Sequence, residues 1–272
     1  MTNPTARRSL TYLWFAGVVI VYLGIIQLGG LAVDEASDVD DLVTTRGLVF
    51  GMIIPLGAAL LFALGVITVL RWWRPVLTDH RPVRRWVWAV PAVFAVAIVV
   101  GIDYSSLAQK DLAFVVTLLI ATQFVGWGEE AMFRGIGVTT LRDHGLTEGR
   151  VALWSSVIFG AVHLTNAIGH GVSAIPQAIA VSFAGYFFYL IRRVSRGNVL
   201  NSVLHGLFDF SIITGTSILV DQKGYPGALA PILVYVILAV VLIIGRHRIE
   251  PAPRPDEPMA DDAPRPAQRR DA

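Results

Sequence analysis

Six ionisable side chains lie inside long apolar runs of this sequence, where such groups are rare and usually have a function. They come from three separate runs and are Glu129, Glu130, Arg134, His163, His205 and Asp209. Carboxylates and imidazoles are the side chains that most often accept and donate protons in catalysis. The residue types therefore favour acid–base chemistry inside a membrane, and they leave a proton relay open as an alternative.

The stretch GEEAMFRG holds two glutamates with different expected surroundings. Glu130 and Arg134 are four residues apart, so in a helix they share a face and can form an ion pair. Glu129 is turned by about 100° from Glu130 and points elsewhere. We therefore expect one glutamate to be neutralised by the arginine and the other to stay free as a general base. A solvated helix face is the competing interpretation, but apolar residues flank the stretch on both sides.

The two later runs repeat this spacing. His205 and Asp209 are four residues apart and can pair, and Phe159 and His163 share a helix face in the same way. A single histidine in a membrane helix is often only a hydrogen-bond partner for a neighbouring helix. The functional interpretation therefore depends on the combination of the three runs.

The three runs place their polar groups at one depth. Glu129 and His163 each lie 13 residues from the nearest basic boundary, and His205 lies nine residues from its own; the boundary residues are Arg142, Arg150 and Arg196. At the rise of an α-helix, this is a layer roughly 14 to 20 Å from the basic ends. We expect the three helices to bring these groups together.

The composition is that of a membrane protein. Hydrophobic residues make up 54% of the chain and charged residues 15%, against about 25% charged in soluble domains, and the mean hydropathy is +0.62. The absence of cysteine excludes disulfides, Cys-ligated zinc, iron–sulfur clusters and thiol nucleophiles. The net charge of +2 comes with arginines beside apolar runs, a pattern of membrane topology that gives no reason to expect a nucleic-acid partner.

The apolar runs predict an all-α, multi-pass bundle of about eight transmembrane helices, because a backbone in lipid must satisfy its hydrogen bonds internally. The loop at 34–41 is acidic, and the segment 71–86 is rich in arginine. By the positive-inside rule, both termini are therefore expected in the cytoplasm of a cell-membrane protein. The expected spans cover residues 11–33, 47–70, 87–102, 112–141, 151–168, 174–191, 199–220 and 228–245.

The polar motifs resemble those of the CPBP family, the CAAX-protease and bacteriocin-processing group of intramembrane proteases, also called the Abi family. The resemblance covers about Val115 to Ser211. The family motifs E-E-x-x-x-R, F-x-x-x-H and H-x-x-x-N/D are matched, in order, by Glu129, Glu130, Arg134, Phe159, His163, His205 and Asp209.

The resemblance implies hydrolysis of a peptide bond within the membrane. It implies that Glu129 and His163 activate water, while His205 and Asp209 line the site and stabilise the oxyanion. Asp209 stands where the eukaryotic CAAX enzymes have asparagine, and an ionised aspartate cannot donate a hydrogen bond. Either His205 donates while Asp209 orients it, or Asp209 is protonated or binds a metal. The implied structural supports are Glu130, Arg134 and Phe159.

A metal site is the second chemical interpretation. Glu129, His163 and His205 would form a His₂Glu set with water in the fourth position, as in zinc hydrolases. The contiguous H-E-x-x-H signature of many metalloproteases is absent from the sequence. We therefore favour catalysis without a cofactor and keep a zinc-dependent protease as the alternative.

On this basis the chain divides into N-terminal transmembrane helices (1–110), a CPBP-like catalytic core (111–217), a C-terminal transmembrane helix (218–250) and a cytoplasmic tail (251–272). The tail is rich in proline and charge, which predicts disorder.

The leading hypothesis is an intramembrane endopeptidase whose partners are the bilayer and a membrane protein or peptide substrate. The alternatives are a non-catalytic membrane scaffold or bacteriocin-immunity factor, and a proton-coupled transporter. Matching pairs of Gly/Pro-broken helices, which mark many transporters, are not evident in the sequence.

Overall fold

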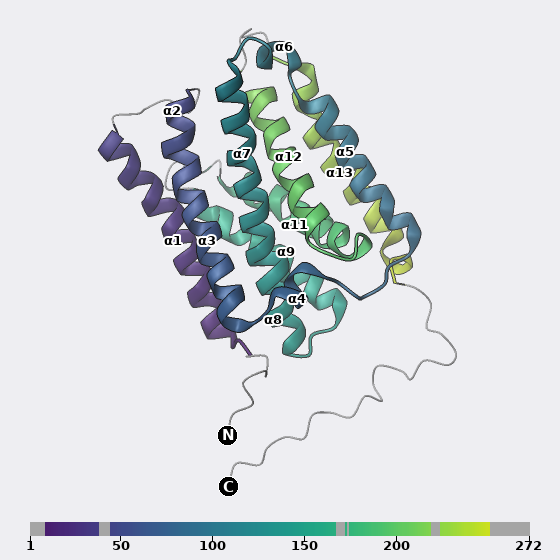
Figure 1. Cartoon of the computed structure of the whole chain (residues 1–272). Helices are drawn as coiled ribbons and strands as arrows, with labels where there is room; N and C mark the ends of the chain where they lie inside the picture. The colour runs from purple at the N-terminus through teal and green to yellow at the C-terminus, as the bar shows by residue number, and fades with distance from the viewer. Residues whose placement is uncertain (1–8, 38–43, 167–171, 173, 219–223, 251–272) are drawn as a thin grey trace.

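The computed structural model describes residues 9–37, 44–166, 172, 174–218 and 224–250 and shows an all-α bundle (Figure 1). The tail from Pro251, predicted to be disordered, lies outside the described residues. The α-helices are α1 (Tyr12–Ser37), α2 (Thr45–Leu48), α3 (Ile54–Leu70), α4 (Trp73–Leu77), α5 (Ala89–Gly101), α6 (Tyr104–Leu107), α7 (Leu112–Glu129), α8 (Val138–Asp143), α9 (Glu148–Val162), α11 (Ala174–Val194), α12 (Val199–Thr216) and α13 (Ala230–Gly245).

Shorter helices of other types join or extend them. Two are π-helices, η1 (Val49–Ile53) and η3 (Glu130–Gly137), and the 3₁₀ helices are η2 (Arg85–Trp88), η4 (His163–Asn166), η6 (Pro226–Leu229) and η7 (Arg246–Arg248).

Within the described residues, five helices are long and apolar enough to cross a membrane: Tyr12–Gly29, Thr45–Leu70, Leu112–Asp143, Ile175–Val194 and Pro226–Arg248. Their outer faces carry exposed aliphatic side chains such as Ile20, Leu61 and Ile244, which suits contact with lipid. The chain is therefore a helical membrane protein.

The predicted count of eight spans is not confirmed, because the runs at 87–102, 151–168 and 199–220 are not in this set. The first forms the shorter apolar helix Arg85–Gly101. The second forms α9, whose 15 residues reach only about 22 Å of a hydrocarbon core of about 30 Å. The third, α12, turns many polar side chains toward the protein, so it lacks the apolar character of a lipid-facing helix.

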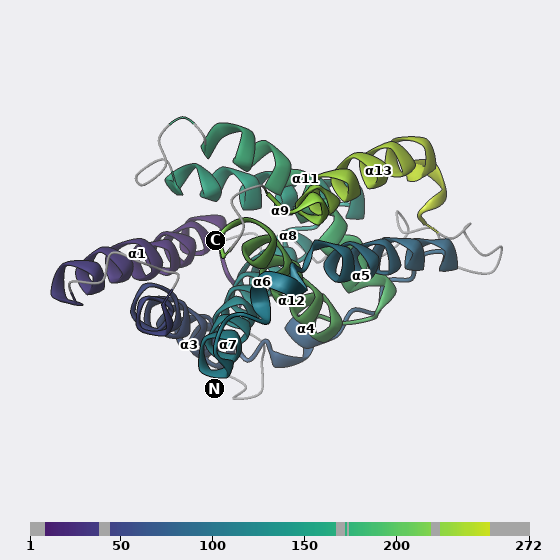
Figure 2. The same cartoon turned by 90° about the horizontal axis from the view of Figure 1, so that it is seen from above.

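Helices α7 and α12 lie side by side in the middle of the bundle, with α1 and α3 on one side and α5 and α13 on the other (Figure 2). Their backbones meet at glycines. A Cβ added to Gly126 would lie 2.4 Å from the carbonyl oxygen of Ser202, and one added to Gly206 would lie 2.8 Å from that of Thr122. Small residues permit such an approach between membrane helices. This close approach brings His205, the residue before Gly206, next to the C-terminal end of α7.

Two apolar clusters flank this central pair. One gathers Phe94, Phe187, Phe188 and Phe208 from α5, α11 and α12, and their rings lie 4.9 to 6.1 Å from that of Phe94. The other joins α1, α3 and α9 to η3 through side chains that include Tyr22, Phe133 and Phe159. The Glu130 helix turn therefore lies between two close-packed cores.

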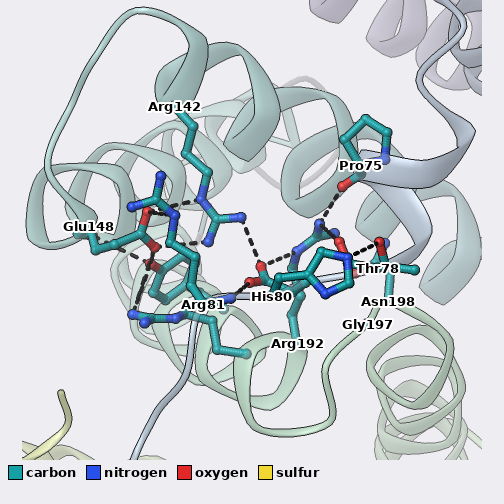
Figure 3. A network of polar contacts seen from close by, with 12 residues as sticks. Pro75, Thr78, His80, Arg81, Arg142, Glu148, Arg192, Gly197 and Asn198 are labelled. Atoms are coloured by element: carbon teal, nitrogen blue, oxygen red, sulfur yellow. Dashed lines mark hydrogen bonds and ion pairs between the residues drawn. The ribbon is translucent and has the colours of Figure 1, made fainter. Parts of the chain in front are cut away.

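A polar network ties together the end of the bundle at which α4 and α8 lie (Figure 3). Asp79, which is 1% exposed, accepts hydrogen bonds from Arg142 at 2.8 Å and Arg192 at 3.1 Å. Burial raises the pKa of Asp79, but the two guanidinium groups outweigh burial and hold the pKa below its usual value. An isolated antiparallel bridge between Thr78 and Gly197 links the same segments.

Candidate active site

Glu130 is the centre of a buried polar cluster. Its side chain is fully buried and forms an ion pair with Arg134 across one helix turn, with 3.0 Å between Oε1 and Nη1. The same oxygen accepts a hydrogen bond from Nδ1 of His205 at 2.8 Å, and Oε2 accepts from Asn201. The predicted pairing of Glu130 with Arg134 is confirmed, and the carboxylate also joins the helix of Arg134 to α12.

The cluster sits where α7 changes into the π-helix η3, which begins at Glu130. π-helical turns are rare and often mark functional sites, because they widen the helix and shift the direction of the side chains. Gly135 in the same segment approaches α4 closely, since a Cβ at this position would lie 2.7 Å from a methyl group of Val76. The irregular turn is thus held in place by neighbours on both sides.

Orientation of His205 by Asp209 was one of the alternatives that the sequence left open; in the structure, Glu130 contacts Nδ1 of His205. Its ring stacks on Phe188, with centroids 4.2 Å apart, and its Nδ1 faces Glu130. A carboxylate can only accept here, so Nδ1 carries a proton. The other nitrogen, Nε2, lies 3.6 Å from Asp209 and 3.7 Å from Glu129. Nε2 is therefore the atom that faces the remaining carboxylates.

Two asparagines, one just before α12 and one in its first turn, were not singled out in the sequence. Asn201 precedes His205 by one turn and donates to the Glu130 side chain, and Asn198 donates to the Glu130 carbonyl oxygen at 2.9 Å. Both are buried. Their spacing of three and four residues from each other and from His205 is a helix-face pattern, and it is the signal by which the sequence could have identified them.

Arg134 is enclosed by aromatic rings. Its guanidinium lies 3.8 Å from the centroid of Phe159 and 5.5 Å from that of Phe188. Among the described residues, its nitrogens have no partner in hydrogen-bond geometry besides the ion pair with Glu130. A cation over an aromatic face is stabilised by the ring quadrupole. Phe159 therefore has a supporting contact of the kind predicted for it.

Glu129 and His163 both face a cavity. Both line a cavity of about 370 Å³ together with His205 and Asp209. Glu129 is 15% exposed at its side chain, and among the described residues its carboxylate forms no ion pair with an arginine. Nδ1 of His163 lies 2.7 Å from the carbonyl oxygen of Phe159, so that nitrogen donates and Nε2 is left for the cavity. The ring contact between Phe159 and His163 is confirmed by a centroid distance of 4.9 Å.

A smaller cavity of about 90 Å³ reaches the same two residues from α1. Tyr22 and Gln27 line it with Glu129 and His163, and Gln27 donates to Thr165 at 3.2 Å. These α1 residues could not be identified in the sequence, because a tyrosine and a glutamine in an apolar helix have no fixed spacing from the motifs. Helix α1 therefore contributes to the walls of the site.

The structure thus brings all four predicted catalytic residues, Glu129, His163, His205 and Asp209, to one cavity. The zinc alternative gains no support. Among the described residues, no group of three or more His, Cys, Asp and Glu side chains is arranged to hold a metal ion.

Comparison with known proteins gave one family. Residues 111–211 match the family described as type II CAAX prenyl endopeptidase Rce1-like. This confirms the resemblance noted over Val115 to Ser211, and the matched segment contains all four of the residues just named. The search of curated proteins found no match, and neither did the search of solved structures.

Proposed function

Because residues 111–211 carry a domain of the Rce1-like CAAX endopeptidase family, a family of peptide hydrolases, we propose that this protein cleaves a peptide bond of a membrane protein or membrane-associated peptide. The observation that supports this most directly is the shared cavity of Glu129, His163, His205 and Asp209. Glu129 ends α7, His163 begins η4, and His205 and Asp209 lie in α12. The cavity therefore brings together acid–base groups that are distant in sequence.

In the proposed mechanism, Glu129 and Nε2 of His163 hold the attacking water. Glu129 lacks the neutralising arginine that its neighbour Glu130 has, so its carboxylate is available to take the proton as the water oxygen attacks the carbonyl carbon. The protonated Glu129 then gives this proton to the leaving amine. A single group thereby serves as base and then as acid.

His205 supplies the stabilisation of the oxyanion in this scheme. Its Nδ1 proton is fixed on Glu130, so a second proton on Nε2 is directed into the cavity, where it donates to the oxygen that gains charge. Asp209, 3.6 Å from Nε2, favours the protonated ring through its negative charge. This arrangement gives Asp209 a role that requires no hydrogen bond from Asp209 to the oxyanion.

The substrate segment that the cavity suits is extended and largely apolar. Beside the polar residues, its lining includes Met52, Val125, Ile212 and Tyr235, and apolar walls favour apolar side chains. We further propose that the chain crosses the membrane eight times with both termini in the cytoplasm. The arginine-rich segment 71–86 supports this orientation through the positive-inside rule.

The test is cleavage of internally quenched peptides by the purified full chain in liposomes. Glu129→Gln, His163→Ala and His205→Ala are each expected to lower kcat/KM by about 10² to 10⁴, with normal accumulation of the protein. His247→Ala makes the same chemical change at an exposed position away from the cavity, and it should cleave like wild type. Wild-type turnover in any of the three cavity variants would refute the assignment.

Two further outcomes separate the alternatives. Activity that survives prolonged chelation supports glutamate catalysis, whereas loss on chelation with recovery on adding zinc supports the metal-dependent version. If the wild-type protein cleaves no peptide of a broad library, yet binds membrane peptides equally well with Glu129→Gln, the scaffold interpretation replaces the protease.

A further inference from the structure

A second large cavity lies apart from the proposed active site and holds about 480 Å³. It is formed by the chain between α4 and α5 and by the C-terminal end of α11. Its lining includes four arginines, Arg81, Arg85, Arg193 and Arg196, together with His80 and Trp88. Such a concentration of guanidinium groups is suited to an anionic ligand.

The acidic groups near this cavity are already engaged. Asp79, the one carboxylate in the lining, is buried and bound to Arg142 and Arg192, two arginines that are labelled in Figure 3. Glu250 pairs with Arg193 at 2.5 Å, and Glu148 pairs with Arg81 at 3.2 Å.

Two of the four arginines have no carboxylate partner among the described residues and are available to bind an anion. Arg85 and Arg196 are exposed, and neither forms an ion pair with a described residue. Arg81 is also 53% exposed at its side chain, so one face of its guanidinium stays in the open. The cavity therefore presents uncompensated positive charge.

The backbone holds Arg196 in an unusual conformation. Its φ is +60°, in the left-handed region where glycine is the favoured residue. The glycine of this segment, Gly197, comes one residue later. Hydrogen bonds on both sides fix the segment: the amide of Asp79 donates to the Arg196 carbonyl at 2.9 Å, and that of Asn198 donates to Leu77 at 3.1 Å. The neighbouring segments therefore hold Arg196 in this conformation.

The cavity also lies at the ends of two apolar helices, the level at which lipid headgroups are expected. Arg85 begins the apolar helix Arg85–Gly101, and the apolar helix Ile175–Val194 ends two residues before Arg196. Trp88, which is 48% exposed, also lines the cavity, and tryptophan is enriched at membrane interfaces. Basic pockets between membrane helices at this level bind phosphate headgroups.

We propose that this cavity binds a phosphate group, supplied by the headgroup of an anionic phospholipid. Arg85, Arg196 and the open face of Arg81 bind the phosphate oxygens, because guanidinium groups match them in geometry and charge. The lipid chains then follow the apolar surfaces of α5 and α11.

The experiment measures the lipid that stays bound to the purified full chain, using native mass spectrometry with phosphatidylglycerol and phosphatidylcholine. Arg85→Ala and Arg196→Gly are each expected to weaken retention of phosphatidylglycerol about fivefold. Arg196→Gly also relieves the backbone strain, so it should fold at least as well as wild type. Arg150→Ala removes an exposed arginine outside the cavity and should leave retention unchanged.

The outcomes separate the two sources of phosphate. Preference for phosphatidylglycerol over phosphatidylcholine, without competition by millimolar inorganic phosphate, supports the lipid. Inorganic phosphate that displaces the lipid and raises the melting temperature of wild type but not of Arg196→Gly assigns the same site to free phosphate. If Arg85→Ala and Arg196→Gly retain as much phosphatidylglycerol as wild type, or Arg150→Ala loses as much as they do, the proposal is overturned.

Discussion

Replacing Glu130 with glutamine is expected to destabilise the fold strongly, whereas the same change at Glu129 is not. Glu130 and Arg134 are both 0% exposed at their side chains. Removing the carboxylate charge leaves the arginine buried without compensation, which typically costs about 3 to 5 kcal/mol. In a chain of this size, that corresponds to a fall in melting temperature of roughly 6 to 20 °C.

Glu129 provides the comparison. The nearest charged partner of its side chain is His205, at 3.7 Å, and the carboxylate faces a cavity instead of an arginine. Its replacement by glutamine therefore leaves no buried charge unpaired, and the expected effect on stability is within about 1 kcal/mol. The two adjacent glutamates should thus separate activity from stability.

The assay is thermal unfolding of the purified protein in detergent, for Glu129→Gln, Glu130→Gln and the double variant Glu130→Gln/Arg134→Met. The double variant removes both charges, and an apolar replacement of a buried ion pair is often nearly neutral. It should therefore regain most of the stability that Glu130→Gln loses, which a double-mutant cycle reports as a coupling energy. A Glu130→Gln protein that melts as Glu129→Gln does would show that the buried ion pair carries no net stability.

Three further predictions concern other parts of the molecule. Burial raises the pKa of both Asp79 and Glu148, but arginine contacts outweigh burial and lower both pKa values. The contribution of these two carboxylates to stability is therefore complete above about pH 4 and is lost as the pH falls below it. Melting curves between pH 6 and pH 3 would detect this loss. Asn201→Ala removes a donor from the buried carboxylate cluster, and should lower stability by about 1 to 3 kcal/mol and lower kcat more than it changes KM. Gly206→Ala places a Cβ 2.8 Å from a backbone oxygen and should lower stability by about 1 to 3 kcal/mol. Gly65→Ala is the control: nothing lies within 4 Å of the new atom, so this change should be neutral or stabilising. Equal melting temperatures of the two glycine variants would contradict the close approach of α7 and α12.

Two side-chain contacts near the candidate site were predicted from the sequence and are confirmed, whereas the predicted number of spans is not confirmed. Spacing along a helix is a strong rule, so the pairing of Glu130 with Arg134 and the contact of Phe159 with His163 follow from residue numbers alone. Span counting relies on apolar character, which measures exposure to lipid. Helix α12 is surrounded by other helices and carries buried polar groups, so its apolar signal is weak.

The partner that orients His205 was beyond this kind of reasoning. Within one helix, Asp209 is the nearest carboxylate by spacing, whereas Glu130 lies 75 residues away in the chain. Their contact depends on how closely α7 and α12 approach, and this distance is set by Gly126 and Gly206. A single sequence does not show how closely two helices approach; the distance is known only from the packed structure.

The walls of the proposed active site come from more of the chain than the matched domain. Tyr22 and Gln27 of α1 and Tyr235 of α13 line the two cavities that reach Glu129, yet all three lie outside residues 111–211. The groups proposed to make and break bonds therefore lie inside the matched segment, whereas part of the cavity wall lies outside it. Exchanging α1 or α13 between relatives is expected to alter which peptides are accepted and to leave the acid–base chemistry intact, so selectivity in this architecture can evolve separately from catalysis.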